Sequence, residues 1–256
     1  MIISKKSELV KLKEGGKILR QALNAAKEEA KKAASQNIST HQINEAAESV
    51  ISSYGAVPSF KSYKPDGITA FPAAACVSVN NEIVHGVPRR DRFVKTGDIV
   101  KVDIGVKHKG LFTDAAISFT IGHIPEKSQK LIQVTREALL TGLREVKPGN
   151  RLGDYGVAVE KFVQEKGFFV VKGLVGHGVG RAVHEPPQIP NFGEPGTGEL
   201  FKEGMVIALE PMVNEKNSGI KVASDGMTFI TKKGDLSAHF ENTIVVTENG
   251  CQVLTE

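Results

Sequence analysis

The sequence predicts an α+β fold in which two pseudo-symmetric α/β halves enclose a central antiparallel sheet. In each half, two amphipathic helical segments precede segments that alternate as β-strands do. Residues 95–103 and 202–210 also share a pattern of lysine, glycine and a final acid at a constant offset of 107 positions. So long a period indicates a duplicated half rather than a solenoid. We therefore expect one domain over residues 1–256, with repeats at about 1–122 and 123–256.

The first half begins with two helical segments. Apolar residues recur at helical spacing over residues 7–35, with lysine and glutamate between them. Ser39 and Gln42 have the spacing of a capping box, and an apolar stripe continues from there up to Gly55. We expect two consecutive amphipathic helices.

Strands follow these helices. Residues 60–72 include a Lys-Pro-Asp-Gly sequence and are expected to form a loop, and residues 76–79 are expected to form a strand. Residues 98–106 alternate strictly, with Val and Ile at the even positions on one face. Residues 107–110 have turn chemistry, so residues 111–120 are the expected return strand of a hairpin.

This hairpin brings two aspartates close together. If His108 and Lys109 are the central loop residues, Asp103 and Asp114 lie directly opposite each other. A bulge at Gly110 would shift the pairing by one or two residues. Both registers bring the two carboxylates near each other.

The second half repeats the plan. One helical stripe covers about residues 127–146 and ends before Pro148 and Gly149, and another covers about residues 152–166 and ends before Gly167.

Composition indicates an ordinary globular protein. The 256 residues are 40% hydrophobic and 24% charged, enough to build a core without disulfides. Cys76 and Cys251 lack the spacing of a zinc ribbon or redox motif, which favours a reducing compartment. The N-terminal residues lack a signal-peptide pattern, and no apolar run approaches the roughly 20 residues of a membrane span. We expect a cytoplasmic protein, and its charge of +4 is typical of a solvated surface.

Four acids border the expected core strands. Asp103 and Asp114 lie within the hairpin, Glu210 ends the repeated strand of the second half, and Glu241 precedes an apolar strand. Unpaired carboxylates would cost several kcal/mol to bury, so they must reach solvent at strand ends, be hydrogen-bonded or be neutralised by cations. Because four are placed alike, we favour a shared cation site.

Histidines support a cation site. His177 lies between two glycines, His184 follows seven residues later, and His85 lies in the first half. One imidazole with four carboxylates suits two adjacent divalent ions better than one tetrahedral structural zinc. Two such ions can activate a nucleophilic hydroxide for hydrolysis. We expect the remaining histidines to be ordinary packed or surface residues: His41, His108, His123 and His239.

These motifs together resemble type I methionine aminopeptidases in their short bacterial form. The resemblance covers almost the whole chain and implies the pita-bread fold, a dinuclear metal site, and a hydrolase that removes the initiator methionine before a small residue. Its motifs are Val-His85-Gly, Val-Asp103-Ile-Gly, Thr-Asp114, Gly-His177-Gly-Val-Gly-Arg, Val-His184-Glu-Pro-Pro, Leu-Glu210-Pro-Met and His-Phe-Glu241-Asn-Thr.

The resemblance also implies a role for each residue. Asp114 and Glu241 would bridge the two ions, and Glu210 would also act as general base toward the bridging water. His184 would hydrogen-bond the substrate carbonyl oxygen, and His85 would contact the scissile amide. The implied metal ligands are Asp103, Asp114, His177, Glu210 and Glu241.

Cofactors are implied in the same way. The resemblance implies two divalent ions, which could be Co, Mn, Fe(II), Zn or Ni. It also implies a monovalent cation, Na or K, near Asn80 and Ser237.

The implied methionine pocket departs from the usual family pattern. Phe71 and Cys76 fit the lining, whereas extra residues before Phe71 would displace Tyr63. Val183 replaces a phenylalanine, and Met227 stands where an aromatic residue is common in bacterial members. We expect a wider, softer pocket that tolerates norleucine or other long apolar side chains.

Two other functions stay open. A prolidase or aminopeptidase P uses a similar ligand set, although such peptidases usually carry an additional N-terminal domain. A metal-free pita-bread binding module would suit the basic residues 89–92, but such modules lack the ligands present here. The favoured function implies the N-terminal methionine of peptides and nascent chains as substrate and a transient, salt-sensitive ribosome association. We expect a monomer with neither DNA nor membrane as partner.

Overall fold

The computed structural model describes residues 1–64 and 69–256. The expected loop over residues 60–72 therefore lies partly outside the described residues, as does most of its Lys-Pro-Asp-Gly sequence.

The helices are α1 (Lys6–Lys31), the 3₁₀ helix η1 (Lys32–Ala34), α2 (Thr40–Ser53), α3 (Glu126–Leu143) and α4 (Leu152–Glu165). The strands are β1 (Ile38–Ser39), β2 (Val57–Pro58), β3 (Ala75–Val79), β4 (Glu82–Val84), β5 (Phe93–Val94), β6 (Ile99–His108), β7 (Leu111–Thr120), β8 (Phe169–Val170), β9 (Gly176–Gly178), β10 (Glu185–Ile189), β11 (Val206–Leu209), β12 (Met212–Asn214), β13 (Ile220–Val222), β14 (Phe229–Thr231), β15 (Ser237–His239), β16 (Glu241–Thr247) and β17 (Gly250–Val253).

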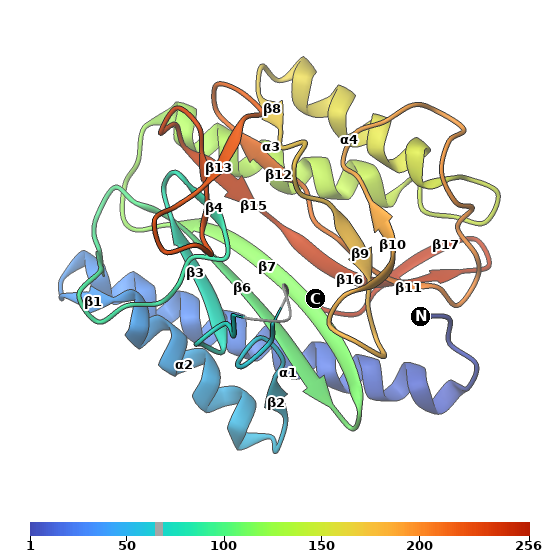
Figure 1. Cartoon of the computed structure of the whole chain (residues 1–256), viewed down its shortest axis with the longest axis horizontal. Coiled ribbons are helices and arrows are strands. Elements are labelled where there is room, and N and C mark those ends of the chain that lie inside the picture. The colour runs from blue at the N-terminus through green and yellow to red at the C-terminus, as the bar shows by residue number, and fades with distance from the viewer. Residues whose placement is uncertain (65–68) are drawn as a thin grey trace.

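The four predicted amphipathic helices are confirmed. The capping box at the start of α2 is present: the Ser39 N–H donates to Gln42 Oε1 at 2.9 Å, and the Gln42 N–H donates to Ser39 Oγ at 3.3 Å. Figure 1 shows α1 and α2 on one side of the strands, and α3 and α4 on the opposite side. No helix within the described residues is long and apolar enough to cross a membrane.

The central sheet is antiparallel, as predicted. Among the described residues, nine strands form it in the order β10-β9-β11-β16-β7-β6-β2, with β17 paired to β16 and β3 paired to β6. The pairing of β16 with β7 joins the two halves of the chain, because β16 belongs to the second half and β7 to the first. Strands that carry the predicted acids are therefore neighbours in space.

The two faces of β6 lie in different buried environments. Its even-numbered residues, Val100 to Val106, pack in a core cluster with α1 and α2 side chains such as Leu19 and Ile43. Its opposite face carries Lys101 and Asp103, which are also buried. Burial of polar groups on that face marks it as the functional side of the sheet.

The register of the hairpin differs from one of the two predicted pairings. Lys109 and Gly110, with φ of 47° and 85°, form the two-residue turn, which is the conformation that a type I′ hairpin requires. Asp114 therefore pairs with Gly105 rather than with Asp103. Direct opposition of the two aspartates was wrong, and the two-residue shift is the observed register.

The duplicated segments adopt the same turn. In residues 95–98 and 202–205, the N–H of the fourth residue donates to the carbonyl of the first at 3.1 and 3.0 Å. The third residue is Gly97 or Gly204, with φ of 98° or 79°. Glycine adopts such angles at little cost, which explains why this residue recurs in both halves.

Candidate metal centre and substrate cavity

The acidic cluster arises from strand register. Asp103 pairs with Ala116 on β7, and Ala116 pairs with Glu241 on β16, so the three side chains share one face of the sheet. Asp114 lies two residues before Ala116 and points to that same face. The small side chain of Ala116 leaves room above it, and carboxylate oxygens of Asp103, Asp114 and Glu241 lie within 4.8 Å of one another.

These carboxylates are buried, and one oxygen of each has no hydrogen-bond partner among the described residues. Among the described residues, the side-chain oxygens Asp103 Oδ1, Asp114 Oδ1 and Glu241 Oε1 are buried and have no hydrogen-bond partner. Burial raises the pKa of Asp103 to about 7 and raises the pKa values of Asp114 and Glu241 well above normal, with neighbouring carboxylates adding to the shift of these last two. Such a cluster needs positive charge nearby.

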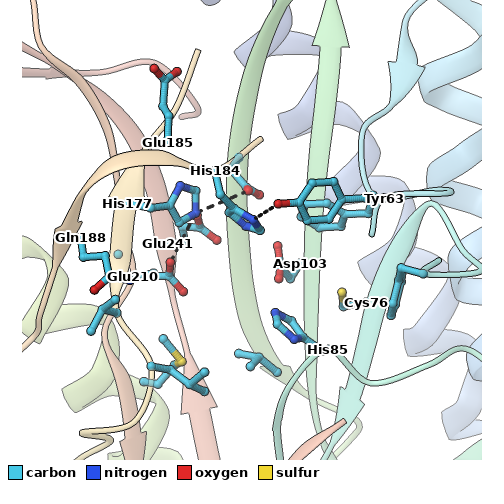
Figure 2. A pocket seen from close by; sticks show the side chains of 18 of the residues that line it. Tyr63, Cys76, His85, Asp103, His177, His184, Glu185, Gln188, Glu210 and Glu241 are labelled. Atoms are coloured by element: carbon cyan, nitrogen blue, oxygen red, sulfur yellow. Dashed lines mark hydrogen bonds and ion pairs between the residues drawn. The ribbon is translucent and has the colours of Figure 1, made fainter. Parts of the chain in front are cut away.

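His177 and Glu210 complete the cluster from β9 and from the residue after β11. His177 Nε2 lies 3.5 Å from Glu210 Oε1 and 3.9 Å from Asp114 Oδ2. Its Nδ1 lies 2.9 Å from the carbonyl oxygen of Gly178, so a neutral ring donates there and keeps the Nε2 lone pair for a cation. Burial lowers the pKa of His177 to about 4 and raises that of Glu210 to about 8. Figure 2 shows these side chains converging with Glu241.

The glycines around His177 permit close strand packing. A Cβ on Gly176 would lie 2.5 Å from the carbonyl oxygen of Ala208, and one on Gly178 would lie 2.2 Å from that of Pro186. Any side chain there would push β9 away from its neighbours, and the imidazole would leave the cluster.

His239 belongs to the cluster, although the sequence led us to expect an ordinary histidine. It is 1% exposed, and its Nε2 lies 3.6 Å from Glu210 Oε2 and 3.9 Å from Glu241 Oε2. Neither ring nitrogen has a hydrogen-bond partner within the described part of the chain. The His-Phe-Glu spacing already placed His239 and Glu241 on the same side of an extended segment, which was the available signal.

His184 and His85 flank the cluster. The rings of His184 and His177 meet edge to face with centroids 4.4 Å apart, and His184 Nδ1 lies 2.9 Å from the hydroxyl of Tyr63. Burial lowers the pKa of His184 to about 4, and the neighbouring His177 adds to that shift. His85 has φ of 58°, a left-handed conformation that is unfavourable for a side chain with Cβ, and its ring packs against Phe229.

A cavity of about 770 Å³ connects these polar groups to an apolar region. Phe71, Cys76 and Tyr63 line it, so Tyr63 is not displaced from the pocket. Val183 and Met227 pack in the same apolar cluster but are not among the described residues that line the cavity. Further lining residues, to which the sequence assigned no role, include Phe60, Val84, Leu174, Val175, Glu185, Gln188 and Met212.

The predicted monovalent-cation residues lie beside a lysine. The carbonyl oxygens of Asn80 and Ser237 both accept hydrogen bonds from Lys101 Nζ, at 2.6 and 3.1 Å.

The donor set fits divalent ions. Three overlapping groups bring potential ligand atoms within 4.8 Å of one another, and Asp114, His177 and Glu241 each belong to two of them. Carboxylate oxygens with one or two imidazole nitrogens are ligands that Mn, Fe, Co and Zn accept. The orphaned carboxylate oxygens on one wall of the cavity are the atoms that such ions would satisfy.

Comparison with known proteins agrees with this geometry. The sequence profile of metallopeptidase family M24 matches residues 10–248. Methionine aminopeptidase of Clostridium perfringens is 42% identical over 255 residues, covering 100% of this chain and 98% of that protein. Methionine aminopeptidase 1 of Bacillus subtilis is 44% identical over 256 residues, covering 100% and 99%.

Solved structures show the same architecture. The crystal structure of methionine aminopeptidase from Thermotoga maritima superimposes with a TM-score of 0.92 at 41% identity, covering 100% of both chains. The prolidase of Pyrococcus horikoshii shares the fold, with a TM-score of 0.77 at 22% identity, and this chain covers 63% of it. The pita-bread fold is thereby confirmed, and the chain belongs to metallopeptidase family M24.

Proposed function

We propose that this chain is a metal-dependent aminopeptidase that hydrolyses the N-terminal methionine from peptides and nascent proteins, with a preference for a small second residue. One observation carries the proposal: a cavity of about 770 Å³ has a cluster of buried carboxylates on one wall and an apolar lining on the other. That arrangement suits an apolar N-terminal side chain beside a hydrolytic metal site. Full-length relatives named methionine aminopeptidase support the same function.

The proposed metal ligands are the five residues that converge beside the cavity. Asp103, Asp114 and Glu241 would hold one ion, and His177, Glu210 and Glu241 would hold a second, because each set brings ligand atoms within 4.8 Å of one another. The ions would be two of Co, Mn, Fe(II), Zn or Ni. When bound, such ions polarise the scissile carbonyl and lower the pKa of an attacking water molecule.

The chain's own residues would then move protons and position the substrate. Glu210 accepts the proton of the attacking water and later returns one to the leaving amine. His184 donates a hydrogen bond to the carbonyl oxygen as negative charge develops there. A Tyr63 hydroxyl that donates to His184 Nδ1 leaves the proton on Nε2, the nitrogen that is free to face substrate. His85 contacts the scissile amide from the other side of the cavity.

The methionine side chain would occupy the apolar end of the cavity. Phe71, Cys76 and Tyr63 form its wall, with Val183 and Met227 packed in the same cluster. Burial, with nearby carboxylates adding, raises the pKa of Cys76 well above normal, so its neutral thiol behaves as a small apolar group.

The proposed setting follows from the substrate. Residues 1–256 would act as one catalytic domain, as a monomer in the cytoplasm, and without DNA or membrane partners. Nascent chains would be met near the ribosomal exit tunnel, where the mild basic charge of +4 gives weak docking. Co-sedimentation with ribosomes should weaken as salt is raised, and sedimentation that salt leaves unchanged would contradict this docking.

The test is release of free methionine from Met-Ala-Ser by metal-stripped protein, with and without added Mn, Fe(II) or Co. Metal-dependent release is expected, and Asp103→Asn and Glu241→Gln should abolish both release and metal uptake measured by calorimetry. Asp91→Asn changes an acid that is paired with Arg89 at the exposed surface and should change neither. Folded protein that releases no methionine with any metal but cleaves Xaa-Pro peptides would move the function to the proline-specific class.

A further inference from the structure

Lys101 is a buried lysine in the middle of β6, two residues before Asp103. It is 1% exposed, a rare position for a charged side chain that has no carboxylate partner among the described residues. Its Nζ instead donates to two backbone carbonyl oxygens, those of Asn80 at 2.6 Å and Ser237 at 3.1 Å. Burial lowers the pKa of Lys101 to about 7, whereas the carboxylates of Glu82 and Asp98 act to raise it.

The two carbonyls belong to segments that carry site residues. Asn80 lies in the turn between β3 and β4, and β4 leads directly into His85. Ser237 begins β15, which ends at His239, two residues before Glu241. The Ser237 N–H also donates to the Asn80 carbonyl at 3.1 Å, so the lysine joins three segments at one point.

The turn around Asn80 is held so that its carbonyl faces Lys101. Asn80 Nδ2 donates to Asp98 Oδ1 at 2.8 Å, and the Ile99 N–H donates to Asn80 Oδ1 at 3.0 Å. The Val79 N–H donates to a carboxylate oxygen of Glu82 at 2.6 Å. This network fixes the carbonyl independently of the lysine, so removing the ammonium would leave its acceptor in place.

Converging backbone carbonyls can form a binding site for a small cation. Monovalent ions such as K⁺ are held in proteins by carbonyl oxygens that replace the hydration shell. A lysine ammonium is a compact point charge with three donors, so a side chain of the protein itself can occupy such a cation site. These are also the residues at which the resemblance led us to expect Na or K.

We propose that Lys101 is an internal substitute for a monovalent cation, because its ammonium occupies the binding site between the Asn80 and Ser237 carbonyls. The enzyme therefore needs no Na⁺ or K⁺. Deleting the side chain opens the site for these ions. Lys101 would thus be a positioning residue that holds β4 and β15 against β6. The expected effect on activity rests on the proposed peptidase function, whereas the expected effect on stability does not.

The first test uses the wild-type protein. Thermal unfolding and methionine release are compared in KCl, NaCl and choline chloride at equal ionic strength. The same Tm and the same rate are expected in all three salts. A saturable rise in Tm or rate with K⁺ or Na⁺ would overturn the proposal, because a site already filled by the Lys101 ammonium cannot bind these ions.

The second test uses Lys101→Ala, with Lys101→Met as its matched control. In choline chloride, Lys101→Ala should have a lower Tm and a rate reduced about tenfold, and KCl or methylammonium chloride should restore both saturably. Lys101→Met fills the space without a charge and should show the same losses without rescue. Sodium NMR line broadening that appears in Lys101→Ala and is absent from wild type would report the ion directly.

Two results would refute the assignment. The first is that Lys101→Ala remains as stable as wild type in choline chloride. The second is that Lys101→Ala loses stability but responds to no monovalent cation. Either result would show that the carbonyl site does not bind a monovalent cation. Lys107→Ala, which removes an exposed lysine from the same strand, should match wild type in every salt. If wild type released no methionine at all, the Tm and NMR measurements would still decide the proposal.

Discussion

The hydroxyl of Tyr63 lies 2.9 Å from Nδ1 of His184, and the two rings meet edge to face with centroids 5.1 Å apart. This contact orients an imidazole that lines the cavity. Tyr63→Phe keeps the ring and removes the hydroxyl. We expect kcat to fall about three- to tenfold with little change in KM, since the loss concerns a transition-state hydrogen bond.

Steady-state kinetics on Met-Ala-Ser would measure this effect. Tyr54→Phe is the matched control, because Tyr54 is exposed and its hydroxyl contacts only Gln21 among the hydrogen bonds of the described residues. Equal kcat in Tyr63→Phe and wild type would show that His184 is oriented by other contacts.

The buried His239 is expected to orient Glu210. Burial lowers its pKa to about 4, although Asp103 acts to raise it, so the ring is neutral and keeps one N–H. Its Nε2 lies 3.6 Å from Glu210 Oε2 without a hydrogen bond in this structure, and we expect Glu210 to accept this N–H in the metal-loaded enzyme. His239→Ala removes that donor and leaves space beside Glu210, which should reduce kcat about 10- to 100-fold. His239→Gln keeps a donor of similar reach and should retain most of the activity. Comparable losses in both variants would argue for packing rather than hydrogen bonding as its contribution.

The stability of metal-free protein should fall as pH rises from 6.5 to 8. Burial raises the pKa of Asp103 to about 7 and of Glu210 to about 8, and raises Asp114 and Glu241 further, so the folded state holds protons that the unfolded state has released. Unfolding therefore becomes more favourable as these acids ionise.

Other groups do not reverse this sign. The histidines with lowered pKa values change protonation on unfolding mainly below pH 6.5. Lys101, with its pKa lowered to about 7, acts in the opposite direction, but it is one group against four acids. Urea unfolding in chelator at several pH values would measure the slope, which Asp114→Asn should reduce. A free energy of unfolding that rises with pH in chelator would contradict the prediction.

The methionine pocket is expected to accept norleucine. An unbranched apolar chain of similar length loses only the contacts of the thioether, so kcat/KM for norleucine-Ala-Ser should lie within about tenfold of that for Met-Ala-Ser. Val183 is 6% exposed and packs behind the lining, so Val183→Phe should reduce kcat/KM for both peptides by crowding the wall. Val57→Phe, at a position 55% exposed, is the control. Absence of norleucine turnover even at high enzyme concentration would refute the wider pocket.

Local patterns were sufficient for the four helices and the longest strands, whereas most of the short strands of the second half were not predicted. Helical spacing and the Ser39–Gln42 capping box predicted α2, and strict alternation predicted β6 with its buried even-numbered face. Those signals are carried by neighbouring residues, which is why a single sequence contains them. The hairpin register was left open between a loop centred on His108 and Lys109 and a bulge at Gly110, because it depends on which residues adopt positive φ, here Lys109 and Gly110.

Sequence alone therefore determined the four helices, the β6–β7 hairpin, the repeated segments at residues 95–103 and 202–210, and the acids that interrupt apolar strands. Only the tertiary structure decided which of those groups meet: the order of the sheet sets β16 beside β7 and so brings Glu241 to Asp103, and it places His239 against Glu210. It also decided that the ammonium of Lys101 reaches the carbonyl of Ser237, 136 residues away. Such contacts depend on pairings between distant strands, whose closure is set by the burial of the whole core rather than by any local pattern.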